Sequence, residues 1–207
     1  MEKEFSEKYP ELISDKLHET KKKIIFSTLQ LLSEGGYESF TAQNIINKAG
    51  ISKGALYHHF KSIDDIPVEA IKQLRKSKLY VPIVKLDLFF SLEDYLDHYY
   101  NYFIENSKKT DVLAVSLYYS QKSLFNEEYR INKNCLTNDL LDYHKNNIKF
   151  FYSKSIPEDI LNSVASLLVF TTEGIMAHSF MYKDTNKFRK TWDILIKTIK
   201  IELETFI

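Results

Sequence analysis

Residues 49–60 read AGISKGALYHHF, and this stretch decides how the N-terminal part of the chain folds. Gly50 can end one short helix, because glycine adopts the left-handed backbone of a helix C-terminus, and Ser52 is a preferred N-cap for the next. Two short helices joined by a tight, glycine-containing turn form a helix-turn-helix, whose second helix enters the major groove of DNA. The stretch therefore predicts a DNA-reading helix that begins at residue 53.

The polar groups after this turn suit contact with DNA. Ser52 leaves the backbone N–H groups of the helix start free for a phosphate, and Lys53 can bind guanine or phosphate. Gly54 allows the backbone to approach the duplex closely. Further donors follow at Tyr57, His58, His59 and Lys61.

Some of the same residues have a plainer interpretation. Helical spacing places Leu56, Tyr57 and Phe60 on the inner side of the second helix, so packing and phosphate contact explain Tyr57 equally well. Adjacent histidines on a helix diverge by roughly 100° and cannot chelate one metal ion together. His58 and His59 therefore favour DNA contact over metal binding.

Helical spacing of apolar residues continues on both sides of the turn, and β-type alternation is scarce. An apolar face over 24–32 is closed by Gly35-Gly36, and capping boxes open further helices near Ser62, Ser91 and Ser155. We therefore predict an all-α fold, with a three-helix N-terminal helix-turn-helix domain followed by a larger C-terminal helical bundle.

Charge is distributed unevenly although the 207-residue chain has a net charge of zero. Residues 1–15 carry a net charge of −3, whereas residues 16–62 hold seven lysines and three glutamates, a net of +4. A phosphate backbone responds to such local charge, because screening limits its reach to about 8 Å at physiological salt. A basic segment thus lies beside an acidic leader.

The remaining bulk features indicate a soluble cytoplasmic protein. Cys135 is the only cysteine and cannot form an internal disulfide. The N-terminus is acidic and lacks the apolar core of a signal peptide, and no stretch approaches the ~20 uninterrupted apolar residues of a membrane-spanning helix.

The run from Ile24 to Ile66, IIFSTLQLLSEGGYESFTAQNIINKAGISKGALYHHFKSIDDI, resembles the DNA-binding domain of the TetR family of transcriptional regulators. This resemblance covers about a fifth of the chain, and the remainder matches only in length and helical character. The matching residues are Leu31-Leu32, Gly36-Tyr37, Thr41, Ile45, Ala49-Gly50-Ile51-Ser52, Gly54, Leu56-Tyr57, His59-Phe60 and Ser62.

The resemblance implies a homodimer that binds a palindromic operator through its N-terminal helices. It implies that the C-terminal helices bind a small molecule and that the last two helices form the dimer interface. By motif position the helix-turn-helix is Thr41 to Phe60, with the recognition helix from Lys53 to His59. The implied division is an acidic leader over 1–19, a DNA-binding domain over 20–62, and a ligand-binding and dimerisation domain over 63–207.

The predicted DNA-binding residues combine the turn with nearby lysines of the first helix. They are Lys22, Lys23, Thr41, Gln43, Ser52, Lys53, Gly54, Tyr57, His58, His59 and Lys61. Several positions depart from the family pattern, which commonly has an alanine pair at Ser27-Thr28, usually alanine at Ile46 and often lysine at Ile63. Because isoleucine cannot bind a phosphate, other lysines near the reading helix are expected to do so in place of Ile63.

Aromatic residues dominate the second half of the chain, which contains most of the 14 tyrosines and 14 phenylalanines. Such richness usually forms a core, but tyrosine hydroxyls in an apolar wall also suit a ligand cavity. The predicted ligand-binding residues are Tyr99, Phe103, Tyr118, Phe125, Tyr129, Tyr143, Phe170 and Glu173. The histidines show no metal-ligand spacing, and we expect neither a metal nor a cofactor.

Dimerisation is expected through the last two helices, because reading a palindrome requires two-fold symmetry. Small residues along one side of 160–182 permit close helix approach, and an apolar face follows in the final helix. The predicted interface residues are Ser163, Ser166, Gly174, Ala177, Trp192, Ile196, Ile199 and Leu203.

Together these features predict a ligand-responsive dimeric regulator, favouring a repressor that a small hydrophobic or aromatic molecule releases from DNA. The helix over 62–79 would change state when the molecule binds. No carboxylate pair or nucleophile-base spacing suggests an enzyme. The alternative is a small-molecule-binding helical protein with a weakened DNA-binding head.

Overall fold

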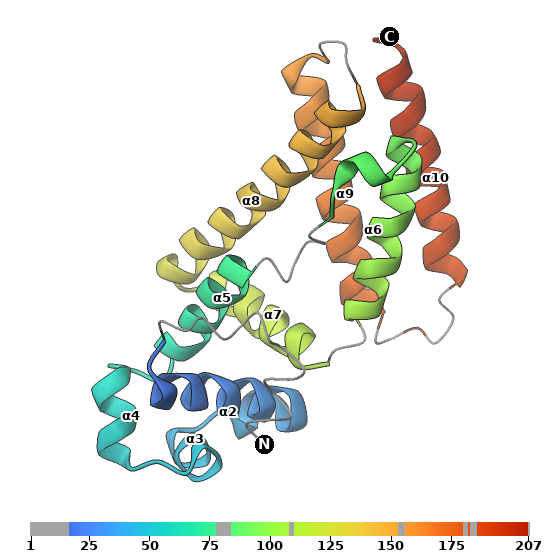
Figure 1. The fold of residues 1–207 in the computed structure, drawn as a ribbon. Coiled ribbons are helices and arrows are strands. Elements are labelled where there is room, and N and C mark those ends of the chain that lie inside the picture. The colour runs from blue at the N-terminus through green and yellow to red at the C-terminus, as the bar shows by residue number, and fades with distance from the viewer. Residues whose placement is uncertain are drawn as a thin grey trace. The chain divides into compact units, whose positions relative to one another are not determined.

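The computed structural model describes residues 17–77, 84–107, 110–152, 156–179, 182 and 186–206, and these residues form helices and no strands (Figure 1). The predicted all-α fold is confirmed. The helices are α2 (Glu19–Gly35), η2 (Gly36–Ser39), α3 (Ala42–Ala49), α4 (Lys53–His59), α5 (Asp65–Ser77), η3 (Leu86–Leu88), α6 (Leu92–Ser107), α7 (Thr110–Ser123), α8 (Glu127–Phe151), α9 (Glu158–His178) and α10 (Asn186–Glu204).

The chain divides into two compact units that are not consecutive in sequence. The first unit comprises Met1–Tyr80 with Lys109–Lys133, and the second comprises Val81–Lys108 with Asn134–Ile207. The first unit therefore contains α5, α7 and the start of α8 in addition to the helix-turn-helix, because α5 and α7 both pack against α2. These packing units differ from the predicted domains, which divide at residue 62. That boundary between a DNA-binding and a ligand-binding domain stays a prediction.

The core of the first unit forms around α2. Ile24, Leu29 and Leu32 are buried along one face of this helix, and Leu56 of α4 and Ile66 of α5 are completely buried. Gly36, with φ of 60°, ends α2 in a backbone conformation that favours glycine.

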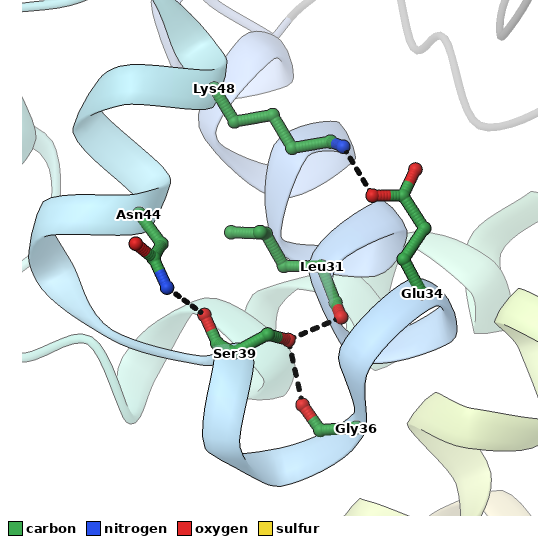
Figure 2. Close-up of polar contacts among 6 residues, drawn as sticks. All are labelled: Leu31, Glu34, Gly36, Ser39, Asn44 and Lys48. Atoms are coloured by element: carbon green, nitrogen blue, oxygen red, sulfur yellow. Dashed lines mark hydrogen bonds and ion pairs between the residues drawn. The ribbon is translucent and has the colours of Figure 1, made fainter.

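Polar contacts fix the connection from α2 to α3 (Figure 2). The Ser39 hydroxyl lies within hydrogen-bonding distance of the carbonyls of Leu31 and, at 2.8 Å, of Gly36. Asn44 of α3 donates to the Ser39 carbonyl at 3.0 Å. A Lys48–Glu34 ion pair of 2.6 Å then joins α3 to α2, so the first helix of the predicted turn is held at both ends.

The core of the second unit is aromatic. Trp192 of α10, Tyr95 of α6 and Ile148 of α8 are at most 1% exposed, and Leu161 and Leu168 of α9 are completely buried beside them. This burial explains the apolar character of α9, which by length and composition alone is apolar enough to cross a membrane. A core helix of this kind passes the same test.

Capping explains where several of these helices begin. Ser91 accepts a hydrogen bond from the backbone of Asp94 at 3.2 Å, and Asp94 accepts one from the backbone of Phe90 at the same distance. The Ser62–Asp65 capping box makes the corresponding 2.9 Å bond from the Ser62 backbone to the Asp65 carboxylate. The predicted box at Ser155 lies outside the described residues.

Candidate nucleic-acid interface

The turn between α3 and α4 has the predicted backbone and caps. Thr41 accepts a hydrogen bond from the backbone of Asn44 at 3.2 Å, and Ser52 accepts one from the backbone of Ala55 at 3.1 Å. Gly50 has φ of 64° and ψ of 39°, the left-handed conformation that ends α3. These three side-chain and backbone features fix the start and end of a short helix pair.

Helix α4 has one buried face and one exposed face. Leu56 is completely buried and Phe60 is 5% exposed, so they anchor α4 against the core of the first unit. Tyr57 is 44% exposed, and the structure thus places it on the surface and not in the core. Lys53 and His58 are also exposed.

Three other predicted DNA-binding positions, Ser52, Gly54 and Lys61, are exposed as well. The predicted residues of 52–61 thus lie on α4 and at its two ends, and His59 among them is half-buried. Helices α3 and α4 both pack against α2 (Figure 1), so the exposed side of α4 is supported by a complete core.

Helix α3 contributes a second exposed polar group. The predicted residues Thr41 and Gln43 are exposed, and the Gln43 amide donates a 2.9 Å hydrogen bond to the Asn47 side chain. Asn47 was not among the predicted residues. Its position four residues after Gln43, and so on the same side of the helix, was the available signal.

The lysines at the start of α2 differ in their surroundings. Lys22 is 7% exposed, and its ammonium group forms a 2.7 Å ion pair with Glu19. A phosphate contact by Lys22 would replace this pair, and its role in DNA binding stays a prediction. Lys23 is exposed, whereas Lys21 pairs with Glu69 at 3.3 Å.

Three histidines meet where α4 ends and α2 begins. The His59 ring centroid lies 5.0 Å from that of His18 and 5.1 Å from that of His58. Partial burial is the largest cause that lowers the pKa of His59 below its ordinary value. The positive charges of His18, His58 and Lys21 lower it further. His18 was missed by the sequence interpretation because it precedes the matching region.

The predicted ligand-binding residues are divided between the two units. Tyr118 and Tyr129 belong to the first unit, where both are buried and both bond to Asp64. Phe125 is 86% exposed and Phe170 is 62% exposed, so neither lies within a core. The assignment of these four residues to a ligand site stays a prediction.

Four predicted ligand-binding residues do lie in the second unit at least partly buried: Tyr99, Phe103, Tyr143 and Glu173. Tyr99 stacks against Phe103 with ring centroids 6.3 Å apart and lies 6.4 Å from Tyr143. Burial raises the pKa of Tyr99 above its ordinary value, so its hydroxyl stays protonated. The three aromatic residues form an uncharged wall.

The predicted dimer interface also needs correction in its α10 half. Trp192, Ile196, Ile199 and Leu203 are at most 9% exposed, because this face of α10 packs into the core of its own unit. The exposed apolar residues of these helices lie on other faces: Leu167, Phe170, Ile194 and Ile201. On α9, Ser163 is exposed and Ser166, Gly174 and Ala177 are half-buried.

Within the described residues, no three histidine, cysteine, aspartate or glutamate side chains lie close enough to hold a metal ion together.

Residues 24–70 match the family model for bacterial regulatory proteins of the tetR family. The Transposon Tn10 TetC protein of Escherichia coli is 34% identical over 93 residues, which cover 43% of this chain and 47% of that protein. The uncharacterized HTH-type transcriptional regulator YerO of Bacillus subtilis is 39% identical over 54 residues, covering 26% of this chain and 19% of YerO. The chain thus spans less than half of either relative's length.

Solved regulator structures share the fold over most of this chain. A putative transcriptional regulator from Saccharomonospora viridis, in complex with choline, has a TM-score of 0.68 and 17% identity, covering 86% of this chain and 96% of that one. The multidrug binding protein EbrR, complexed with malachite green, has a TM-score of 0.60 and 13% identity, covering 87% and 98%.

Proposed function

Because this chain belongs to the TetR family of bacterial regulatory proteins by its N-terminal domain, we propose that it is a dimeric cytoplasmic repressor. It binds a palindromic operator as a homodimer. A small hydrophobic or aromatic molecule that binds the second unit releases it from DNA.

The observation that carries this proposal is the two-sided nature of α4. Seven residues are too few for an independently stable helix, so packing through Leu56 and Phe60 is what holds α4 in place. The opposite side presents Lys53, Tyr57 and His58 to solvent. A short rigid helix with exposed donors is suited to read base edges, while Ser52 and Gly54 let a phosphate approach the helix start.

The exposed apolar residues of the last two helices support the homodimer. Ile194 and Ile201 of α10 are each 66% exposed, and Phe170 and Leu167 of α9 are 62% and 41% exposed. Large apolar side chains left exposed on the last two helices favour a protein interface there. An added Cβ at Gly174 would meet nothing within 4 Å, so no side chain of this chain fills the space directly beside this glycine.

The connection between the effector and DNA is proposed to pass through the start of α5. Tyr118 of α7 and Tyr129 of α8 both bond to Asp64, which directly precedes α5. A shift of α7 or α8 on effector binding would thus move the segment that follows α4. Effector binding shifts the protein from the DNA-binding state to the released state only if the effector binds these two states with different affinity.

The proposal is tested by selecting bound duplexes from a random DNA pool at moderate salt. We expect a palindrome to be enriched, and Lys53→Ala to weaken binding to it and to lower the salt slope by about one. Tyr57→Ala should weaken binding by about tenfold. Lys190→Ala, which removes an exposed lysine from α10, is the matched control and should bind as the wild type does.

Failure to enrich any sequence, with the protein folded and dimeric, would favour the alternative of a small-molecule-binding protein without operator recognition.

A further inference from the structure

Two buried polar side chains of the second unit lack a hydrogen-bond partner among the described residues. His144 is 1% exposed, and neither of its ring nitrogens is bonded. Trp192 is completely buried, and its indole N–H is also without an acceptor. Leaving such groups unpaired in a protein interior costs free energy, so a native chain that keeps two of them requires an explanation.

These two groups share one neighbour. The Tyr99 ring lies edge-on to His144 with centroids 4.9 Å apart, and its centroid is 6.2 Å from that of Trp192. Phe103 also lies 6.2 Å from Trp192. The unpaired atoms are therefore parts of one aromatic cluster contributed by α6, α8 and α10.

Other buried polar groups on the same helices are paired. Asn147, one turn after Tyr143 on α8, donates to the Tyr95 hydroxyl at 2.6 Å, and Tyr95 bonds to Tyr143 at 2.9 Å. Thr172 of α9 bonds to the carbonyls of its own helix at 2.9 Å. The packing of this unit thus satisfies these hydroxyl and amide groups, whereas the nitrogens of His144 and Trp192 have no partner among the described residues.

The charge of this cluster restricts what it can bind. Burial lowers the pKa of His144 to about 3, so the ring is neutral at physiological pH and offers one donor and one acceptor. The Trp192 indole offers one donor. The Arg189 guanidinium of this unit is held at the surface by 2.8 Å ion pairs with Asp97 and Asp193, and the described residues provide no buried cation here for an anionic ligand.

A cation without an acceptor would leave the Trp192 N–H unpaired, and a hydrocarbon would leave all three nitrogen atoms unpaired. A flat, uncharged molecule with a carbonyl oxygen, which can accept two hydrogen bonds, and an N–H donor can pair all three and stack on the aromatic rings.

We propose that His144 and Trp192 are the hydrogen-bonding groups of the effector site, and that the effector is an uncharged aromatic molecule carrying both an acceptor and a donor, of the aromatic amide class. This inference rests on the proposed function only in treating the bound molecule as an effector. Binding of that molecule to the second unit does not depend on DNA binding. Tyr99 and Phe103 contribute the stacking surface.

The test uses four probes built on one benzene ring, three of them of equal size and shape, on the full-length wild-type protein without DNA. They are benzamide, benzoate, benzamidine and toluene, which differ in charge and in hydrogen-bonding groups. Trp192 is the only tryptophan in the chain, so the protein has a single indole N–H resonance and a single indole emission. Both report directly on the proposed site.

We expect benzamide to saturate the protein and to move the indole proton resonance to lower field, as an accepted hydrogen bond does. Benzoate and benzamidine should bind at least tenfold more weakly, and toluene should not produce the downfield shift. An unchanged indole resonance with benzamide, or equal binding of benzoate, would overturn the proposal. It would equally be overturned if ordered water alone pairs the His144 and Trp192 nitrogens and no probe displaces it.

A variant pair adds an independent readout. His144→Phe replaces the imidazole by an aromatic ring without hydrogen-bonding atoms, so benzamide affinity should fall about tenfold. The melting temperature of the unliganded variant should rise, because an unpaired polar group has been removed. Tyr95→Phe, which alters the paired network, should bind benzamide within about twofold of the wild type. Unchanged benzamide affinity of His144→Phe would count against the site.

The probe comparison on the wild-type protein decides the matter even if a variant fails to fold. If benzamide binds but no operator is found, the proposed repressor function is wrong and the binding site stands. If an operator is bound and benzamide is not, the repressor function stands and the site assignment is wrong.

Discussion

The hydroxyl group of Tyr118 donates a 3.0 Å hydrogen bond to the carboxylate of Asp64, 54 residues earlier in the chain. The Lys122 ammonium lies 3.2 Å from the same carboxylate, and the Tyr129 hydroxyl bonds to the Asp64 backbone carbonyl. One residue, placed between α4 and α5, is thus held by two helices that follow it by more than 40 positions.

Removing the Tyr118 hydroxyl should weaken this connection. Tyr118→Phe leaves the Asp64 carboxylate with Lys122 alone, and we expect the free energy of unfolding to fall by about 1–2 kcal/mol. This corresponds to a decrease of roughly 2–8 °C in the melting temperature, measured by calorimetry at fixed protein concentration. Tyr37→Phe is the control, because Tyr37 is 60% exposed and its loss of a hydroxyl should change stability by less than about 0.5 kcal/mol.

A melting temperature of Tyr118→Phe equal to that of the control would show that the bond contributes nothing to stability.

Burial of His144 makes the stability of the protein depend on pH. Its pKa is lowered to about 3 in the folded state, against an ordinary value of 6.5. Between these two pKa values the unfolded chain binds a proton at His144 that the folded chain does not bind. The free energy of unfolding is therefore highest above pH 6.5 and decreases as the pH falls. We expect a loss of about 1.4 kcal/mol per pH unit from pH 6 to pH 4, measured by urea unfolding.

His144→Phe should remove that slope, and the difference between the two proteins separates His144 from carboxylates that titrate at lower pH. Parallel curves for wild type and variant over this range would contradict the neutral buried state.

The histidine cluster at the end of α4 should make DNA binding depend on pH in the opposite sense. The pKa of His59 is lowered in the free protein by partial burial and by neighbouring charges. A phosphate nearby favours the protonated ring, so operator affinity should increase about three- to tenfold as the pH falls from 7.5 to 6.0 at constant salt. Fluorescence anisotropy with the selected operator measures this.

His59→Gln should flatten the dependence. His178→Gln, which changes an exposed histidine of α9, should leave it unchanged. A wild-type affinity that is constant over this range would mean that the cluster does not face a phosphate.

The exposed apolar residues of α10 should control the oligomeric state. Ile194→Glu places a charge where we expect a second copy to pack, and the protein should sediment as a folded 24.4 kDa monomer. Leu88→Glu changes an equally exposed apolar residue on η3 and should leave the dimer intact. A dimeric Ile194→Glu protein would place the interface elsewhere.

Local features of the helix-turn-helix could be predicted from sequence because each is decided by one or two residues. Gly50 adopts a left-handed backbone and Ser52 caps the next helix, as their chemistry requires. The sequence does not decide whether the Tyr57 ring is buried or exposed. Helical spacing alone does not separate a partly exposed ring from a buried one at the edge of an apolar face. The lysine run shows the same limit, since the Glu19 partner of Lys22 became evident only from the fold.

Longer-range placement could not be predicted, because an apolar stripe shows that a helix face is covered but not what covers it. Trp192 and Leu203 looked like interface residues and are instead the core of their own unit. Tyr118 and Tyr129 looked like ligand-binding residues of the second half, yet they pack with the N-terminal helices. Pairwise packing of this kind has no signature in a single sequence.

The interrupted layout of the two units limits how this protein can be taken apart or recombined. The chain passes between units at residues 80–81, 108–109 and 133–134, and α7 lies against α2 in the unit that carries the reading helix. A fragment cut after residue 62 or 80 would lack α7 and expose the apolar surface that α7 covers. Grafting this reading head onto another sensor therefore demands three junctions. A single genetic crossover would therefore divide one of the two units instead of exchanging a whole sensor.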